Sequence, residues 1–199
     1  MKLTVVGVGP AGDSMITLAG QRAVESATLL IGSKRQLRMF CGHTAKTVEI
    51  NGRTSEIIAC VEANKNERIV ILASGDPLLF GIGKGIRERY EKVEIISGIS
   101  SLQYIFTKIP VDMNEVFFTS THGRRLDFES LKIHQKIAMV TDKVNHPGII
   151  AKAFLGEPVT VYIGTDLGYE SESVVMGKPE EFCEFKKEGM HVVVIHYER

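Results

Sequence analysis

The segment SGDPLLFGIGKG, residues 74–85, combines the residue types in this sequence that are most suited to binding a ligand. Gly75 allows unusual backbone angles and a close approach of another group to the chain. Pro77 disfavours the α conformation at Asp76, so a carboxylate is expected at the carboxyl end of a strand, where open α/β sheets bind ligands. The alternative is that Asp76 caps a helix beginning at Pro77, which leaves the three later glycines of the segment unexplained.

The segment SGISS, residues 97–101, has a similar character after the next expected strand. Gly98 can turn the chain there. The hydroxyl of Ser100 or Ser101 can cap the following helix, or it can bond the polar groups of a ligand. Hydroxyls in such positions are more often caps, so this segment by itself favours a helix cap over a ligand contact.

The segment STHGRR, residues 120–125, follows the first expected strand of the second half. His122 can transfer a proton near neutral pH, and Arg124 and Arg125 can bind carboxylates through paired hydrogen bonds. An exposed basic loop explains the same residues equally well, so both interpretations stay open on chemistry alone.

The N-terminal stretch GVGPAG, residues 7–12, matches the Gly-x-Gly-x-x-Gly pattern of dinucleotide-binding loops. Pro10 lies inside the turn, and the residues after the third glycine read as further loop, where the pattern requires a helix. The second strand, expected at residues 29–31, runs into Lys34 and Arg35 in place of the usual acidic residue. These cations suit a 2′-phosphate, so an NADP site remains an alternative to a tight structural loop.

The composition is that of an ordinary globular protein of 199 residues, 44% hydrophobic and 24% charged. Lys plus Arg equals Asp plus Glu, at 24 each, which argues against capture of nucleic acid by a bulk positive field. The three cysteines have no zinc-ligand spacing, so no metal is expected, and reduced thiols suit a cytoplasmic location. No apolar run reaches the ~20 residues that a membrane-spanning helix needs.

Apolar runs alternate with helical patterns along the chain, which predicts an α/β fold with parallel strands covered by helices. In the first half, strands are expected at residues 3–8, 29–31, 48–50, 69–73 and 93–96, and helices at 16–27, 55–63, 83–90 and 101–109. In the second half, strands are expected at 116–120, 137–141, 159–163, 173–176 and 192–197, and helices at 148–155 and 179–185. The higher proportion of strand in the second half favours a mixed sheet there.

The polar segment at residues 109–116 predicts a linker, because Pro110 ends a helix and polar residues follow. We therefore expect two α/β domains, residues 1–112 and 113–199, with a ligand cleft between them.

The motifs VGVGPAGD, SGDPLLFG and SGISS together resemble the tetrapyrrole methylases, S-adenosylmethionine-dependent enzymes built from two α/β domains. The order of motifs and elements matches over nearly the full chain. LLIGSKRQL, read as a strand followed by a loop, with STHGRR and TDLGYESE, resembles the branch that methylates cobalt-precorrin-7 at C5 in cobalamin biosynthesis. The departures, among them Ala11, Ser97 and Glu170, fall in loops and leave the fold assignment intact.

The resemblance implies that S-adenosylmethionine binds in the cleft and leaves as S-adenosylhomocysteine. The implied cofactor contacts are Pro10, Ser74, Gly75, Asp76, Leu79, Ser100, Ser101, Thr141 and Leu167. A corrinoid substrate carries many carboxylates, and the residues implied to bind them are Ser33, Arg35, Arg124 and Arg125. Because the ring supplies its own carbon nucleophile and the thioether leaves as a neutral group, alignment and exclusion of water are the main catalytic tasks. His122 is the candidate base.

Other members of the family act on uroporphyrinogen, on ribosomal RNA ribose or on the diphthamide precursor of a protein. Balanced charge and the THGRR motif disfavour an RNA substrate. From other classes, an NADP-binding oxidoreductase and a nucleotide-binding regulatory module remain alternatives. The resemblance implies a homodimer, and the pathway implies a C15-methylating decarboxylase as a functional partner. Neither a nucleic-acid partner nor a membrane partner is expected.

Overall fold

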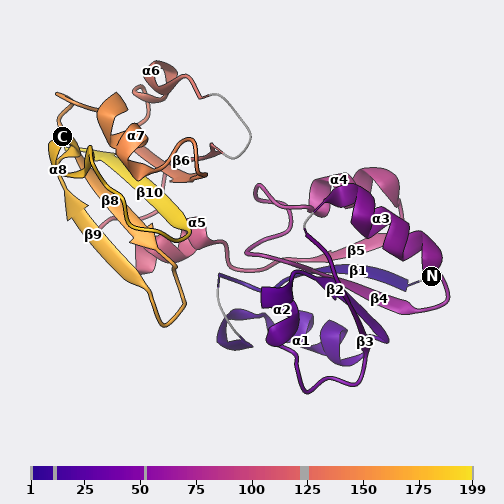
Figure 1. The fold of residues 1–199 in the computed structure, drawn as a ribbon. Coiled ribbons are helices and arrows are strands. Elements are labelled where there is room, and N and C mark those ends of the chain that lie inside the picture. The colour runs from indigo at the N-terminus through magenta and orange to yellow at the C-terminus, as the bar shows by residue number, and fades with distance from the viewer. Residues whose placement is uncertain (1, 11–12, 52, 122–125, 199) are drawn as a thin grey trace. The chain divides into compact units, whose positions relative to one another are not determined.

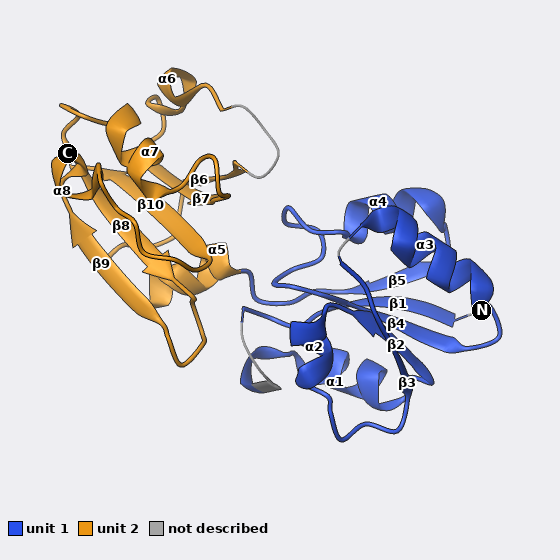
Figure 2. Cartoon of the chain, viewed as in Figure 1, with its two compact units in different colours: residues 1–100 blue, residues 101–199 orange. Residues whose placement is uncertain are grey.

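The computed structural model describes residues 2–10, 13–51, 53–121 and 126–198 of the chain. It divides the chain into two compact units, residues 1–100 and 101–199 (Figures 1 and 2). The predicted domain boundary at residues 112–113 stays a prediction. The residues that the structure describes contain no helix long and apolar enough to cross a membrane.

The first unit is a five-stranded parallel sheet in the order β3-β2-β4-β1-β5. Its strands are β1 (Lys2–Gly7), β2 (Leu29–Gly32), β3 (Lys46–Glu49), β4 (Arg68–Ala73) and β5 (Val93–Ile96). Its helices are α1 (Leu18–Glu25), α2 (Lys34–Arg38), α3 (Thr54–Ala63) and α4 (Gly83–Arg89), with a short 3-10 turn at Asp13–Met15.

Helices cover both faces of this sheet, which is why its central strands are apolar at successive positions (Figure 1). On one face, Val5 and Ile71 pack with Ile57 of α3 and Ile86 of α4. On the other face, Val6, Leu30, Val70 and Leu72 pack with Val24 of α1 and with Leu37 of α2. The alternation of side chains along each strand therefore builds two cores from one run of residues.

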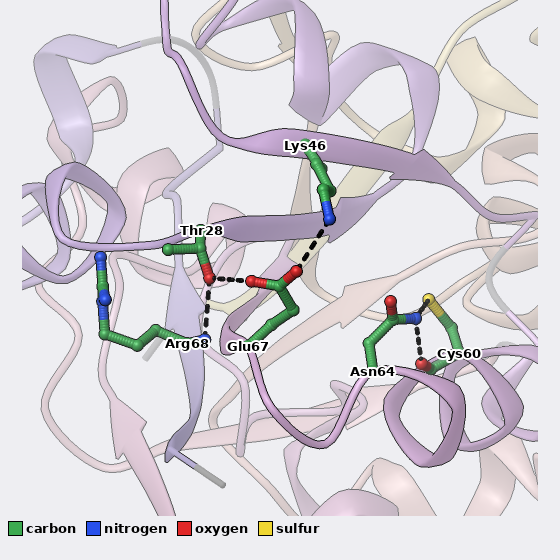
Figure 3. Close-up of polar contacts among 6 residues, drawn as sticks. All are labelled: Thr28, Lys46, Cys60, Asn64, Glu67 and Arg68. Atoms are coloured by element: carbon green, nitrogen blue, oxygen red, sulfur yellow. Dashed lines mark hydrogen bonds and ion pairs between the residues drawn. The ribbon is translucent and has the colours of Figure 1, made fainter.

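At the amino edge of the first sheet, polar side chains beside the strand starts form hydrogen bonds with one another (Figure 3). Glu67 accepts hydrogen bonds from Thr28 Oγ1 at 2.6 Å and from Lys46 Nζ at 2.9 Å, and the Arg68 backbone N–H donates to Thr28 Oγ1. The bond from Thr28, followed by that from Lys46, holds the pKa of Glu67 below its usual value. These contacts tie together the starts of β2, β3 and β4.

The second unit is a mixed five-stranded sheet in the order β6-β7-β10-β8-β9. Its strands are β6 (Val116–Ser120), β7 (Lys136–Val140), β8 (Val159–Thr165), β9 (Ser173–Gly177) and β10 (His191–Tyr197). Its helices are α5 (Ser101–Tyr104), α6 (Phe128–Leu131), α7 (Pro147–Ala153) and α8 (Pro179–Phe182), with a 3-10 turn at Ile105–Thr107. Strands β6 and β7 are parallel and the other pairs are antiparallel, which confirms the predicted mixed sheet.

The predicted strands are all present, with bounds that differ by a few residues at most. Several details differ from the sequence interpretation, among them α6, which was not predicted. The residues after β2, read as a loop, form α2. The helix expected at residues 101–109 is one α-helical turn followed by a 3-10 turn. The capping role considered for Asp76 is wrong, because α4 begins at Gly83 and is preceded by Ile82.

Candidate functional site

The loops after β1, β4 and β5 meet at the carboxyl edge of the first sheet. From β1 the chain goes to β2 on one side of the sheet, and from β4 it crosses β1 to reach β5 on the other side. The strand order therefore reverses between β4 and β1, and open α/β sheets bind ligands at such a position. The loops are joined by backbone hydrogen bonds: the Gly75 N–H donates to Gly9 O at 3.0 Å, and the Val8 N–H donates to Ala73 O at 2.9 Å. Backbone hydrogen bonding of the fold itself therefore brings these glycine-rich segments together.

The backbones of these loops approach more closely than any side chain would allow. A Cβ atom added at Gly98 would lie 2.3 Å from the carbonyl oxygen of Gly75, and one added at Gly7 would lie 2.6 Å from Gly98 N. Gly75 also has a φ of 60°, in the left-handed region that favours glycine. Glycine is thus required at Gly7 and Gly98 by backbone packing and is favoured at Gly75 by its φ angle, whatever ligand is bound.

The Asp76 carboxylate ties two of the loops together. Its Oδ1 accepts a hydrogen bond from the Leu78 N–H at 2.7 Å, and its Oδ2 accepts one from the Gly98 N–H at 3.2 Å. The first bond shapes the turn after β4, and the second holds that turn against the turn after β5. A direct cofactor contact by Asp76 stays a prediction, but the side chain has this structural task as well.

Ser74 is the centre of a polar network at the end of β4. Its Oγ accepts hydrogen bonds from Arg35 Nη2 at 2.9 Å and from Gln36 Nε2 at 3.1 Å. Ser33 caps α2 in a capping box with Gln36. The structure therefore brings three predicted residues together, the substrate-binding candidates Ser33 and Arg35 and the cofactor-binding candidate Ser74.

Gln36 was not predicted as a site residue, although it joins this network. The residue is 7% exposed and connects Ser33 to Ser74. The signal that would have found it is the spacing of Ser33 and Gln36, which is the sequence pattern of a capping box.

Exposed apolar side chains lie in the same loops as Ser74 and Asp76 or in the loop after β5. Leu78, Phe80 and Ile99 are exposed to 45%, 44% and 41% of their surface, although each lies in one of the two turns that Asp76 joins or directly beside them. Leu79 is partly buried, Ser100 is 5% exposed, and the Cα of Ser100 lies against Gly75. Apolar surface beside a few placed polar groups is the usual character of a small-molecule site.

In the second unit, the predicted cofactor contacts Thr141 and Leu167 lie at one edge of the sheet, after β7 and β8. The Thr141 N–H and Oγ1 both donate to the His191 carbonyl oxygen, at 3.2 Å each. Leu167 is 4% exposed and packs on Gly164. Asp166 accepts a hydrogen bond from the Met190 N–H at 2.9 Å, so the start of β10 holds both loops.

The TDLGYESE loop is fixed by Glu172, which the sequence interpretation did not single out. Glu172 accepts hydrogen bonds from the Gly168 N–H at 2.5 Å and forms an ion pair with Lys108 at 2.7 Å. Partial burial opposes ionisation of Glu172, but the bonds from Lys108 and Gly168 outweigh it and lower the pKa of the carboxyl. The hydrogen bond to Glu172 raises the pKa of Lys108, whose Nζ lies 5.0 Å from the centre of the Tyr104 ring.

His191 has a buried ring nitrogen, Nε2, without a hydrogen-bond partner among the described residues. Burial is the main reason that its pKa is lowered, and the nearby Asp166 carboxylate opposes the shift. The ring lies edge-on to Phe185, with 5.5 Å between ring centres. It is a packed histidine at the start of the last strand.

The candidate base His122 and the substrate-binding candidates Arg124 and Arg125 lie outside the described residues. They follow Thr121, which is fully buried and whose backbone N–H donates to Val140 O at 3.0 Å. Of the remaining predicted contacts, Pro10 is buried beside the Gly9–Gly75 bridge and Ser101 begins α5. Within the described ranges, no cluster of three His, Cys, Asp or Glu side chains could hold a metal ion.

Residues 2–183 match the family model for Tetrapyrrole (Corrin/Porphyrin) Methylases. The chain is 39% identical over 178 residues to the cobalt-precorrin-7 C(5)-methyltransferase of Salmonella typhimurium, covering 86% of this chain and 88% of that one. It is 28% identical over 191 residues to the probable cobalt-precorrin-7 C(5)-methyltransferase of Methanocaldococcus jannaschii, covering 90% of each chain.

Two solved structures share the fold. The precorrin-6Y methylase of Archaeoglobus fulgidus superimposes with a TM-score of 0.77 at 22% identity, covering 100% of this chain and 98% of that one. The uroporphyrin-III C-methyltransferase of Thermus thermophilus, complexed with S-adenosylhomocysteine, gives a TM-score of 0.82 at 19% identity. The match covers 98% of this chain and 97% of that one.

Proposed function

Because the chain belongs to the tetrapyrrole methylase family, we propose that it transfers a methyl group from S-adenosylmethionine to C5 of cobalt-precorrin-7. The family and the class of enzyme predicted from the sequence, a methyltransferase, are confirmed. The observation that supports the specific reaction is the similarity to the Salmonella enzyme, which extends over most of both chains. The role would place the protein in cobalamin biosynthesis.

The carboxyl edge of the first sheet is suited to hold the cofactor. S-adenosylmethionine supplies an electrophilic methyl group on a positively charged sulfur. Gly75 gives the close backbone approach, Ser74 and Ser100 offer polar groups, and Leu79 with its exposed neighbours offers apolar surface. Thr141 and Leu167 remain predicted contacts from the second unit. These residues bind and orient, and they exclude water from the reacting carbon.

The corrinoid substrate would be recognised mainly through its carboxylates. Arg35 is fixed on α2, where it donates to Ser74, so a substrate carboxylate at Arg35 would lie close to the proposed cofactor site. Arg124 and Arg125 are the other proposed carboxylate ligands, and His122 is the proposed base that removes a proton from the substrate. A separate C15-methylating decarboxylase would carry out the other modification of the same ring.

The first experiment is a pair of calorimetric titrations of the purified protein, one with S-adenosylhomocysteine and one with NADP. We expect micromolar binding of S-adenosylhomocysteine only. Asp76→Ala should abolish most of that binding, because it leaves the Leu78 and Gly98 N–H groups without acceptors and loosens both turns. Circular dichroism of the variant shows whether the overall fold is kept.

Activity is then measured with S-adenosylmethionine and cobalt-precorrin-7, by mass spectrometry and by NMR of the product. A product with one added methyl group at C5 supports the proposal. Methylation at another ring carbon, or binding of NADP alone, would contradict it.

A further inference from the structure

The side-chain amide of Gln36 can adopt only one orientation. Its Oε1 lies 2.7 Å from the backbone N of Ser33 and 2.9 Å from Ser33 Oγ. A backbone N–H group can only donate, so the amide oxygen must face Ser33. The Nε2 group must therefore face Ser74, from which it is 3.1 Å away. Only 7% of Gln36 is exposed, which limits competition from water for these bonds.

Both acceptor positions of the Ser74 hydroxyl are consequently occupied. The nitrogens Gln36 Nε2 and Arg35 Nη2 are donors that cannot accept, so the Ser74 Oγ accepts from each of them. A serine hydroxyl has two acceptor lone pairs and one hydrogen. The hydrogen must then be donated to a third group, and the part of the chain that the structure describes provides no further hydrogen-bond partner for Ser74.

We propose that the Ser74 hydroxyl is a dedicated donor to a carboxylate oxygen of the bound ligand, and that Gln36 is the positioning residue that makes it one. Ser74 is exposed, and it lies directly before the turn at Gly75 where the three loops meet. The Arg35 guanidinium 2.9 Å from its oxygen polarises the hydroxyl and favours an anionic acceptor over a neutral one. This inference rests on the proposed methyltransferase function.

A carboxylate at Ser74 has two possible sources in that reaction. One is the amino-acid end of the cofactor, and the other is an acidic side chain of the corrinoid substrate. Either carboxylate would accept the same hydrogen bond from Ser74. Loss of that bond would weaken the binding of the cofactor in one case and of the substrate in the other. A set of three ligands therefore distinguishes them.

The test compares the wild type with Ser74→Ala in three measurements. These are the Kd of S-adenosylhomocysteine, the Kd of 5′-methylthioadenosine, which lacks the amino-acid end, and the KM of cobalt-precorrin-7. Loss of a hydrogen bond to a charged acceptor should weaken the affected constant about 10- to 100-fold. A cofactor carboxylate predicts weaker S-adenosylhomocysteine binding with unchanged 5′-methylthioadenosine binding. A substrate carboxylate predicts a raised KM alone.

Two further variants control for the hydroxyl group and for its location. Ser74→Thr keeps a hydroxyl at residue 74, so it should bind the ligand that Ser74→Ala binds weakly with an affinity close to that of the wild type. Ser26→Ala removes a serine hydroxyl that bonds Ala23 O near the amino edge of the same sheet, and it should leave all three constants unchanged.

Gln36→Glu tests the positioning role. A carboxylate at residue 36 still accepts from Ser33, but it also accepts the Ser74 hydrogen and so removes the donor from the ligand. Gln36→Glu alone should therefore weaken the same constant as Ser74→Ala, with the thermal unfolding midpoint measured beside it. In the double variant that combines Ser74→Ala with Gln36→Glu, the second change should cause no further loss of affinity, because residue 36 acts through the Ser74 hydroxyl.

The outcomes separate this inference from the proposed function. If the wild type binds no S-adenosylhomocysteine, the proposed function itself fails. If the wild type binds it and Ser74→Ala changes neither the Kd nor the KM, the donor role of Ser74 is wrong. Additive losses in the double variant would overturn the positioning role of Gln36.

Discussion

Gly98 has the least room for a side chain at the carboxyl edge of the first sheet. A Cβ there would lie 2.3 Å from Gly75 O and 2.7 Å from Gly7 C, and backbone atoms cannot move aside as a flexible side chain can. We expect Gly98→Ala to lower the free energy of unfolding by about 3 kcal/mol, near the upper end for overpacking. Urea unfolding followed by circular dichroism measures the change.

Gly42→Ala is the matched control, because a Cβ at Gly42 meets no atom within 4 Å. That variant should change the free energy of unfolding by less than about 1 kcal/mol. A Gly98→Ala protein as stable as the Gly42→Ala protein would mean that the three loops do not approach one another as closely as described.

Asp76 shows what the type and position of a single residue can and cannot predict. The Asp-Pro pair after an apolar run was enough to place a carboxylate at the end of a strand. The identity of its partners was not predictable, because Gly98 becomes a neighbour only when β5 pairs with β1. The capping interpretation failed for a different reason, because the helix that follows begins only at Gly83.

Among the elements, β10 carries a pH-dependent contact at its first residue. Burial lowers the pKa of His191, so the unfolded chain binds a proton at this site more readily than the folded one. The stability that the neutral ring contributes is complete above its ordinary pKa of about 6.5 and is lost as the pH falls below that value. Asp166, Lys187 and His146 are the charged or titratable groups that modulate the shift.

We therefore expect His191→Phe to remove part of the loss of stability between pH 7 and pH 5, because phenylalanine fills the space beside Phe185 without titrating. Urea unfolding at several pH values measures this. His196→Phe, in the same strand, leaves His191 in place and should keep the loss. An identical pH dependence in wild type and His191→Phe would show that the ring can be protonated in the folded protein without cost.

Helix α2, like the four-residue α6, is an element that the sequence interpretation missed. Its five residues are too few to show a helical period, and isolated helices of this length are unstable in water. It is held by the Ser33–Gln36 capping box and by packing of Leu37 on the second core of the first unit. The longer elements were predicted correctly because a buried strand or a ten-residue helix such as α3 repeats its pattern several times.

For the whole molecule, ligand binding should appear as added stability. At 100 times its Kd, a ligand that binds only the folded chain adds about 2.7 kcal/mol, which corresponds to a rise of about 5 °C or more in Tm for a chain of this size. We expect S-adenosylhomocysteine to produce this rise and NADP at the same concentration to produce none. Differential scanning calorimetry measures both. A rise with NADP alone would favour the dinucleotide-binding alternative.

By itself, the sequence determined the α/β class, the positions of the strands, the mixed second sheet and the family. These depend on the period of apolar residues and on motifs that are each local in the chain. The tertiary structure alone decided that Gly7, Gly75 and Gly98 are held in backbone contact and that Arg35 and Gln36 converge on Ser74. Those pairs are far apart in sequence, and only the pairing order of β5, β1, β4 and β2 brings them to one edge.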